Sequence, residues 1–334
     1  MIKKSKCNDA IKEEHRKKGK RAYAVLSEEF TVLTFYYDTH MDERGGLSVG
    51  PFGYDDIRWD GHAAEIQIVI FDDSFSQCVL LESTAHWFDG CCRLKEIHGI
   101  ENLKTSAVKD TSHMFQSCSS LEAIDVSNFI TRNVTNMEGM FKSCSSLKTL
   151  DVSMFDTRKV ENFSCMFESC TSLAKLDLCG FSAEVNALLC TTLYDEGFHT
   201  DNAFDMLAMF RNCKNLLSLN LCDFNTSEVV YMSDMFEGCS SIETIDLSSF
   251  TTNDDQDMDG MFSGCTNLKT IYVNTSWKTP IPNVCESGMF EGCINLKGGN
   301  GTAYNHSEND YLFARIDQVD NPGYFTEKDI LSEE

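Results

Sequence analysis

Cysteine and histidine are the side chains of this chain with the widest chemical range. There are 16 cysteines and 8 histidines in 334 residues, enough for a metal site, a thiol nucleophile or several disulfides. His86, Cys91, Cys92 and His98 form the best candidate zinc cluster. Their spacing is not that of a zinc finger or ribbon, and no Cys-x-x-Cys pair occurs in the chain. We therefore expect no metal site.

Catalytic motifs are also missing from the sequence. A catalytic cysteine needs a positioned histidine base, and the histidines here are scattered without a motif. GGNG at 298–301 is followed by neither Lys-Ser/Thr nor a helical pattern, which excludes a phosphate-binding loop and indicates a turn. We expect no catalytic residues, no cofactor and no enzymatic activity.

Half of the cysteines end a repeated motif, in which a Met or Trp and then a Phe precede two variable residues and a Cys. The motif recurs at steps of 27, 26, 26, 43, 26, 26 and 28 residues, and the long step contains an insertion at about 183–199. We interpret these cysteines as an internal ladder of small, buried, reduced side chains, because the parallel side chains of a ladder do not suit disulfide geometry. The ladder consists of Cys91, Cys118, Cys144, Cys170, Cys213, Cys239, Cys265 and Cys293.

Each repeat changes its hydrophobic period midway. Apolar residues in 137–144 have the i, i+3, i+4, i+7 spacing of a short helix. Apolar residues in 147–152 alternate with polar ones, as in a half-buried strand. The strand segments match the leucine-rich pattern L-x-x-L-x-L: LEAIDV, LKTLDV, LAKLDL, LLSLNL and IETIDL. We expect an α/β leucine-rich-repeat solenoid of about eight 26-residue rungs with parallel strands.

The two ends of the chain depart from the repeat. Hydrophobic alternation predicts a hairpin over 22–38 and a strand over 64–71, whereas Ala-Arg-Ile at 314–316 is a candidate last strand and 322–326 an irregular seal. The predicted organisation is a flexible basic tail (1–21), an N-terminal β cap (22–73), the leucine-rich-repeat solenoid (74–297), a C-terminal cap (298–326) and an acidic tail (327–334).

Charge restricts the partners. The chain has 28 Lys and Arg against 52 Asp and Glu, a net charge of −24, which disfavours nucleic acid and anionic membranes. No apolar run of about 18 residues is present, so no membrane span is expected. Residues 1–21 are basic but lack the apolar core of a secretory signal. A cytoplasmic location is therefore not excluded.

A row of acidic positions is the first candidate binding face. Parallel strands would bring equivalent residues side by side at about 4.8 Å. A solvated face bonded to flanking Ser and Thr, a site for a basic partner segment, and a Ca²⁺ site are the alternatives. The row is Asp125, Asp151, Asp177, Asn220 and Asp246. The insertion at 183–199 is the second candidate.

The repeat consensus LxxLDVSxFdTxxVtxMxxMFxxCxSL carries a family resemblance. Together with AYAVLS and LTFYYD near the start, WFDGCCRLKEIHGIENL at 87–103 and NPGYFT near the end, it resembles the BspA-type leucine-rich repeat surface proteins, which share repeats with a mycoplasma lipoprotein family. The resemblance covers nearly all of residues 22–326. It implies a cell-surface or secreted protein that attaches to host matrix, host cells or other bacteria, and it supplies no catalytic residues.

The expected function is therefore that of a non-catalytic, adhesin-like binding protein of a bacterial surface. Its partner would be a protein or a glycan, contacted over many rungs. The alternative is an intracellular or particle-associated structural scaffold, which the missing export signal favours.

Overall fold

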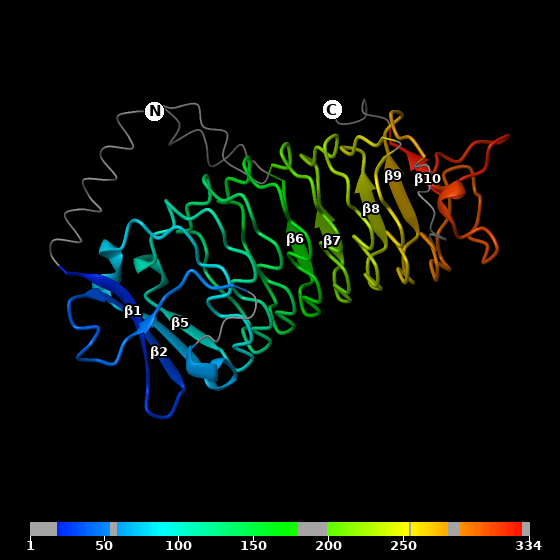
Figure 1. The fold of residues 1–334 in the computed structure, drawn as a ribbon. Helices are drawn as coiled ribbons and strands as arrows, with labels where there is room; N and C mark the ends of the chain where they lie inside the picture. The colour runs from blue at the N-terminus through cyan, green and yellow to red at the C-terminus, as the bar shows by residue number, and fades with distance from the viewer. Residues whose placement is uncertain (1–18, 54–58, 180–198, 254, 280–287, 329–334) are drawn as a thin grey trace, which may run out of the picture.

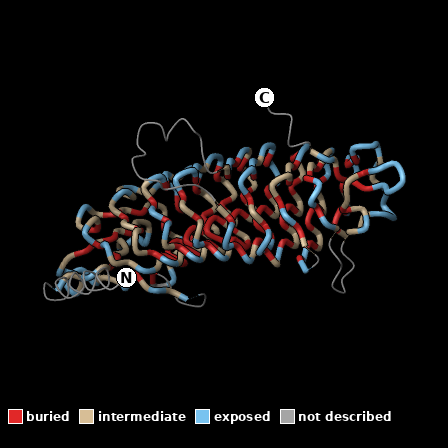
Figure 2. The backbone as a smooth tube through the Cα atoms, turned by 90° about the horizontal axis from the view of Figure 1, so that it is seen from above, coloured by how far each residue is buried: buried red, intermediate tan, exposed pale blue. Residues whose placement is uncertain are grey.

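The computed structural model describes residues 19–53, 59–179, 199–253, 255–279 and 288–328. Figure 1 shows the chain coiling into an elongated stack, with the N-terminal strands at one end and β10 near the other. The basic tail up to residue 18 and the insertion up to residue 198 lie outside the described residues. Figure 2 shows the buried residues running along the interior of the stack.

A mixed sheet closes the N-terminal end. Its strands have the order β3-β1-β2-β4-β5. The hairpin expected over 22–38 is present, since β1 and β2 pair antiparallel with Ala24 opposite Phe35. The ring of Phe35 stacks on Phe71 at 4.7 Å and on Trp87 at 4.9 Å, so the sheet packs directly on the first repeat. The strands are β1 (Arg21–Leu26), β2 (Val32–Asp38), β3 (Leu47–Ser48), β4 (Ile68–Phe71) and β5 (Glu96–His98).

Short parallel strands recur in the later repeats. β6 (Lys175–Asp177) pairs with β7 (Ser218–Asn220), and β8 (Thr244–Leu247) pairs with β9 (Thr270–Val273). The earlier repeats have only isolated parallel bridges at the equivalent place, such as Ala123 with Thr149. Three of the five expected segments, LAKLDL, LLSLNL and IETIDL, therefore contain strands, LEAIDV and LKTLDV share only a bridge, and the sheets are small.

The helix expected over 137–144 is wrong, because these residues form two consecutive turns. The N–H of Met140 donates to the carbonyl of Met137 at 3.2 Å, and the N–H of Cys144 donates to that of Phe141 at 3.1 Å. Gly139 and Ser143 have φ of 55° and 59°, in the left-handed region that an α-helix excludes. Phe141 N–H instead donates to Met166 in the next repeat, at 2.9 Å.

Helical structure in the described residues is limited to short 3-10 segments. They are η1 (Trp59–Gly61), η2 (Ala63–Glu65), η3 (Asp73–Gln77), η4 (Ile100–Asn102) and η5 (Tyr311–Phe313). None belongs to the Met-Phe motif, so the repeats stack through turns and strands. No helix in the described part of the chain is long and apolar enough to cross a membrane.

Phenylalanine rings stack along the interior. Neighbouring ring centroids lie 5.3 to 6.0 Å apart from Phe88 to Phe290, and every one of these side chains is fully buried. Each such burial contributes about 1.5–3 kcal/mol. The stack consists of Phe88, Phe115, Phe141, Phe167, Phe210, Phe236, Phe262 and Phe290.

A second row of side chains joins the repeats by hydrogen bonds. Each is a buried threonine whose hydroxyl donates to a carbonyl of the next repeat and accepts from the N–H of the same residue. Thr226, for example, donates to the carbonyl of Thr251 at 2.7 Å and accepts from its N–H at 3.0 Å. The threonine ladder is Thr105, Thr131, Thr157, Thr200, Thr226 and Thr252.

The C-terminal end adds one more strand to the stack. β10 (Phe325–Glu327) pairs in parallel with β9, so the strand falls in the segment expected to be an irregular seal. Ile316 of the Ala-Arg-Ile segment contributes only an isolated bridge to Phe325. Nearby, buried Asp317 accepts hydrogen bonds from the N–H groups of Asn300 and Thr302 at 2.8 and 3.0 Å, which fixes the GGNG turn.

Candidate binding surface

The strand segments present two exposed columns of side chains, which we call the strand face. Residues at equivalent repeat positions lie opposite each other, since Lys175 pairs with Ser218 and Asp177 with Asn220. Small and polar residues form the first column: Ala123, Thr149, Lys175, Ser218 and Thr244. The second column contains the residues expected to form the acidic row: Asp125, Asp151, Asp177, Asn220 and Asp246. All are exposed except Asp246, which is partly buried.

The carboxylates of the second column also serve their own loops. One oxygen each of Asp125, Asp151 and Asp177 accepts from the backbone N–H two residues later, at 2.9, 2.9 and 3.1 Å. Such bonds stabilise the turn that follows the strand. The hydrogen bonds from Ser127 lower the pKa of Asp125. Local bonding to flanking residues is thus observed.

Calcium is the alternative least supported by this geometry. Where the chain is described, only Cys179, Cys222 and Asp223 bring three ligand atoms close enough to hold an ion. The acidic column forms no such group within those residues.

Asp246 differs from its equivalents because it has a cationic partner. The ammonium of Lys328 lies 2.7 Å from its carboxylate and comes from 82 residues further along the chain. Burial raises the pKa of Asp246. The hydrogen bonds from Lys328 and Ser248 together lower this pKa by more, so it lies below the ordinary value for an aspartate. Sequence reasoning missed this pair, since nothing in the repeat pattern locates Lys328.

The eight ladder cysteines are fully buried, and none of them is joined in a disulfide. The Cys144 thiol donates to the carbonyl of Phe115 at 3.1 Å, and six other ladder thiols make the same bond to the preceding repeat at 3.0 to 3.2 Å. Burial raises the pKa of Cys144 to about 12. A thiol kept protonated in this way is a poor nucleophile and a poor metal ligand.

The four residues considered as a zinc cluster are not brought together. His86 bonds Asp89 at 2.9 Å, Cys91 belongs to the ladder, and His98 bonds Glu96 at 3.0 Å. Cys92 is partly buried. No metal-ligating group in the described residues includes any of them.

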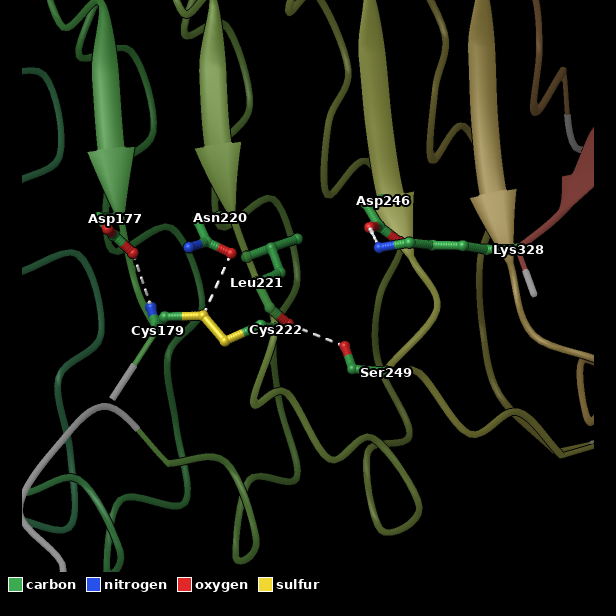
Figure 3. Close-up of a disulfide and its surroundings, with 8 residues drawn as sticks. All are labelled: Asp177, Cys179, Asn220, Leu221, Cys222, Asp246, Ser249 and Lys328. Carbon is green, nitrogen blue, oxygen red and sulfur yellow. Dashed lines mark hydrogen bonds and ion pairs between the residues drawn. A yellow bond between two sulfur atoms is a disulfide. The ribbon is translucent and has the colours of Figure 1, made fainter. Parts of the chain in front are cut away.

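A disulfide joins Cys179 to Cys222, with Cα atoms 5.4 Å apart (Figure 3). Each residue comes two positions after the acidic-row residue of its own repeat, where other repeats have Ser127, Ser153 and Ser248. The pair was missed because disulfides were considered only within the ladder. The available signal was two cysteines at one repeat position on either side of the insertion.

This chain is similar to a solved leucine-rich repeat protein and to one protein family. The chain is similar in structure to the crystal structure of the T. pallidum leucine-rich repeat protein, with 18% sequence identity, a TM-score of 0.33 and coverage of 66% of this chain and 87% of that chain. No curated protein matches the chain in sequence. The family described as "Mycoplasma protein of unknown function, DUF285" matches residues 82–187 and 181–301, which is well over half of the chain. The chain therefore belongs to the DUF285 family.

Proposed function

We propose that this chain is a non-catalytic binding protein, an eight-rung solenoid of leucine-rich-repeat type related to the BspA-type surface proteins. It recognises a protein partner through the strand face, on a bacterial surface. The observation that carries the proposal is the register of the strand face, which aligns exposed side chains such as Asp177 and Asn220 in consecutive repeats. The partner is a host matrix protein, a host-cell protein or a protein of another bacterium.

The strand face suits an extended partner. Its side chains repeat at about 4.8 Å along the stack, and buried ladders fix the backbone beneath them, so little conformational entropy is lost on binding. Repeat stacks bind along such extended surfaces. The column of carboxylates favours a segment with basic residues, whereas the net charge of −24 repels nucleic acid.

The disulfide between Cys179 and Cys222 supports a location outside the cytoplasm. Disulfides persist in oxidising compartments and are rare in reducing ones. Cys222 is exposed, so a cytosolic reductant would reach it. Exposure on the cell surface is the location that fits both the bond and the resemblance.

Binding to an array of extracellular-matrix proteins and glycans tests the recognition. The double variant Asp125→Asn/Asp151→Asn removes two charges of the strand face, and asparagine can still cap the turns. The variant Glu28→Gln/Glu29→Gln removes two exposed charges from the turn between β1 and β2 and is the matched control. We expect weaker capture of a matrix protein by the strand-face variant only. Equal loss in both variants, or no captured protein, would overturn the proposal.

Protease shaving of intact source cells tests the location. Loss of the band on immunoblotting, with a cytosolic marker retained, is the expected result. A band that is protected in intact cells and digested after lysis would assign the protein to the cell interior and support a scaffold role instead.

A further inference from the structure

Two cysteines and a carboxylate converge at the carboxyl ends of β6 and β7. Sγ of Cys179, Sγ of Cys222 and a carboxylate oxygen of Asp223 all lie within 4.8 Å of one another. In the other repeats the position of Asp223 is occupied by Asn128, Met154 or Ser249. Both thiol positions and the acidic residue are thus specific to these two repeats.

We propose that Cys179, Cys222 and Asp223 form a redox-gated site for a soft divalent cation of the Zn²⁺ class. In the oxidised protein the disulfide occupies both sulfur atoms and closes the site. In the reduced protein two thiolates and one carboxylate bind the cation, and water completes a tetrahedral shell. Thiolate and carboxylate are both established zinc ligands, and this proposal does not rest on the proposed partner binding.

The chemistry of opening and loading is balanced. An external thiol reductant supplies two electrons and two protons, so the bond between the sulfurs breaks, two thiols form and the reductant becomes a disulfide. The cation then replaces the two thiol protons, which pass to solvent as two metal–sulfur bonds form. Loading therefore weakens as the pH falls.

The surrounding contacts hold the ligands in place after the bond is cleaved. Pairing of β6 with β7 sets Asp177 opposite Asn220, and the carboxylate of Asp177 accepts from the N–H of Cys179 at 3.1 Å. Oδ1 of Asn220 lies 3.2 Å from Sγ of Cys179. Figure 3 shows Asp177 and Asn220 beside the disulfide. The Asp177 charge adds to that of Asp223 and favours a bound cation.

Accessibility distinguishes this pair from the ladder. The ladder thiols are fully buried, whereas Cys222 is exposed and Cys179 is half-buried. A small reductant or a metal ion reaches the exposed sulfur without unfolding a repeat. The site can thus change state while the stack stays folded.

Cadmium titration of the whole chain tests the site. Cys7, Cys190 and Cys285 lie outside the described residues and are replaced by serine in every sample. We expect the phosphine-reduced protein to bind one Cd²⁺, seen as ultraviolet thiolate-to-metal absorption and by calorimetry, and the oxidised protein to bind none. Asp223→Asn should weaken binding at least about tenfold, Cys179→Ser/Cys222→Ser should abolish it, and the half-buried control Cys92→Ser should leave it unchanged.

Peptide mapping supplies the remaining criterion. The oxidised protein should yield a disulfide-linked peptide that contains Cys179 and Cys222, and its absence would overturn the gating. Equal Cd²⁺ binding by oxidised and reduced protein would do the same. A mapped disulfide with no Cd²⁺ bound after reduction would show that the bond is a structural link only and that the metal site is wrong.

Discussion

The substitution Thr226→Val tests whether the threonine ladder stabilises the stack. The Thr226 side chain is fully buried, and its hydroxyl exchanges two hydrogen bonds with the backbone of Thr251. Valine has nearly the same shape but neither donates nor accepts. A buried group left without its hydrogen bond costs about 1–3 kcal/mol. Because Thr251 is exposed and its carbonyl can turn to water, we expect a total loss of about 2 kcal/mol.

Urea unfolding measures this loss as a lower midpoint with an unchanged slope. Hydrogen exchange gives a local readout, since the Thr251 amide should lose protection. Thr251→Val is the matched control because it makes the same chemical change at an exposed side chain. If Thr226→Val shifts the midpoint no further than Thr251→Val does, the ladder contributes nothing and the reasoning fails.

Three other perturbations follow from the interior. A polar maleimide should modify Cys92 in the native protein and leave the ladder thiols intact; modification of six or more of them, found by mass spectrometry, would contradict their burial. Gly139→Ala should cost about 1–2 kcal/mol in urea unfolding because of its left-handed backbone, and an added Cβ would lie 2.5 Å from Nδ1 of His113; an unchanged midpoint would contradict this. Burial lowers the pKa of His113, but Glu138 and Gln116 raise it to a net value above the ordinary one. Its charged form therefore adds stability below about pH 6.5 that is lost as the pH rises through the raised pKa. His113→Gln should accordingly destabilise more at about pH 5.5 than at about pH 8.5, and a pH-independent effect in urea unfolding would refute this.

Periodicity was a sound guide to what is buried. The positions of Met140, Phe141 and Cys144 were expected to face inward, and all three are fully buried. The spacing i, i+3, i+4, i+7 did not distinguish a helix from two successive four-residue turns. In both structures the residues at these four positions face the interior of the stack. The difference lies in the φ angles of Gly139 and Ser143, and serine gives no sequence sign that it adopts a left-handed conformation.

The repeat pattern could not predict contacts between segments that are far apart in the sequence. Lys328 reaches Asp246 only because β10 joins the sheet beside β9. The disulfide of Cys179 and Cys222 spans 43 residues, and the insertion conceals that these residues are neighbours in the stack. In both cases the sequence carries the residue types, and the three-dimensional register determines the pairing.

The insertion leaves the stack continuous, and this bears on where function is located. Across it, Thr157 donates to the carbonyl of His199 at 2.7 Å, and the thiol of Cys213 donates to that of Phe167 at 3.1 Å. The rings of Phe167 and Phe210 stack at 5.8 Å, within the range of the other repeats. The two flanking repeats thus meet as any other neighbours do. The same two repeats carry the disulfide between Cys179 and the exposed Cys222, so the site proposed for a soft cation lies where the stack keeps its regular contacts.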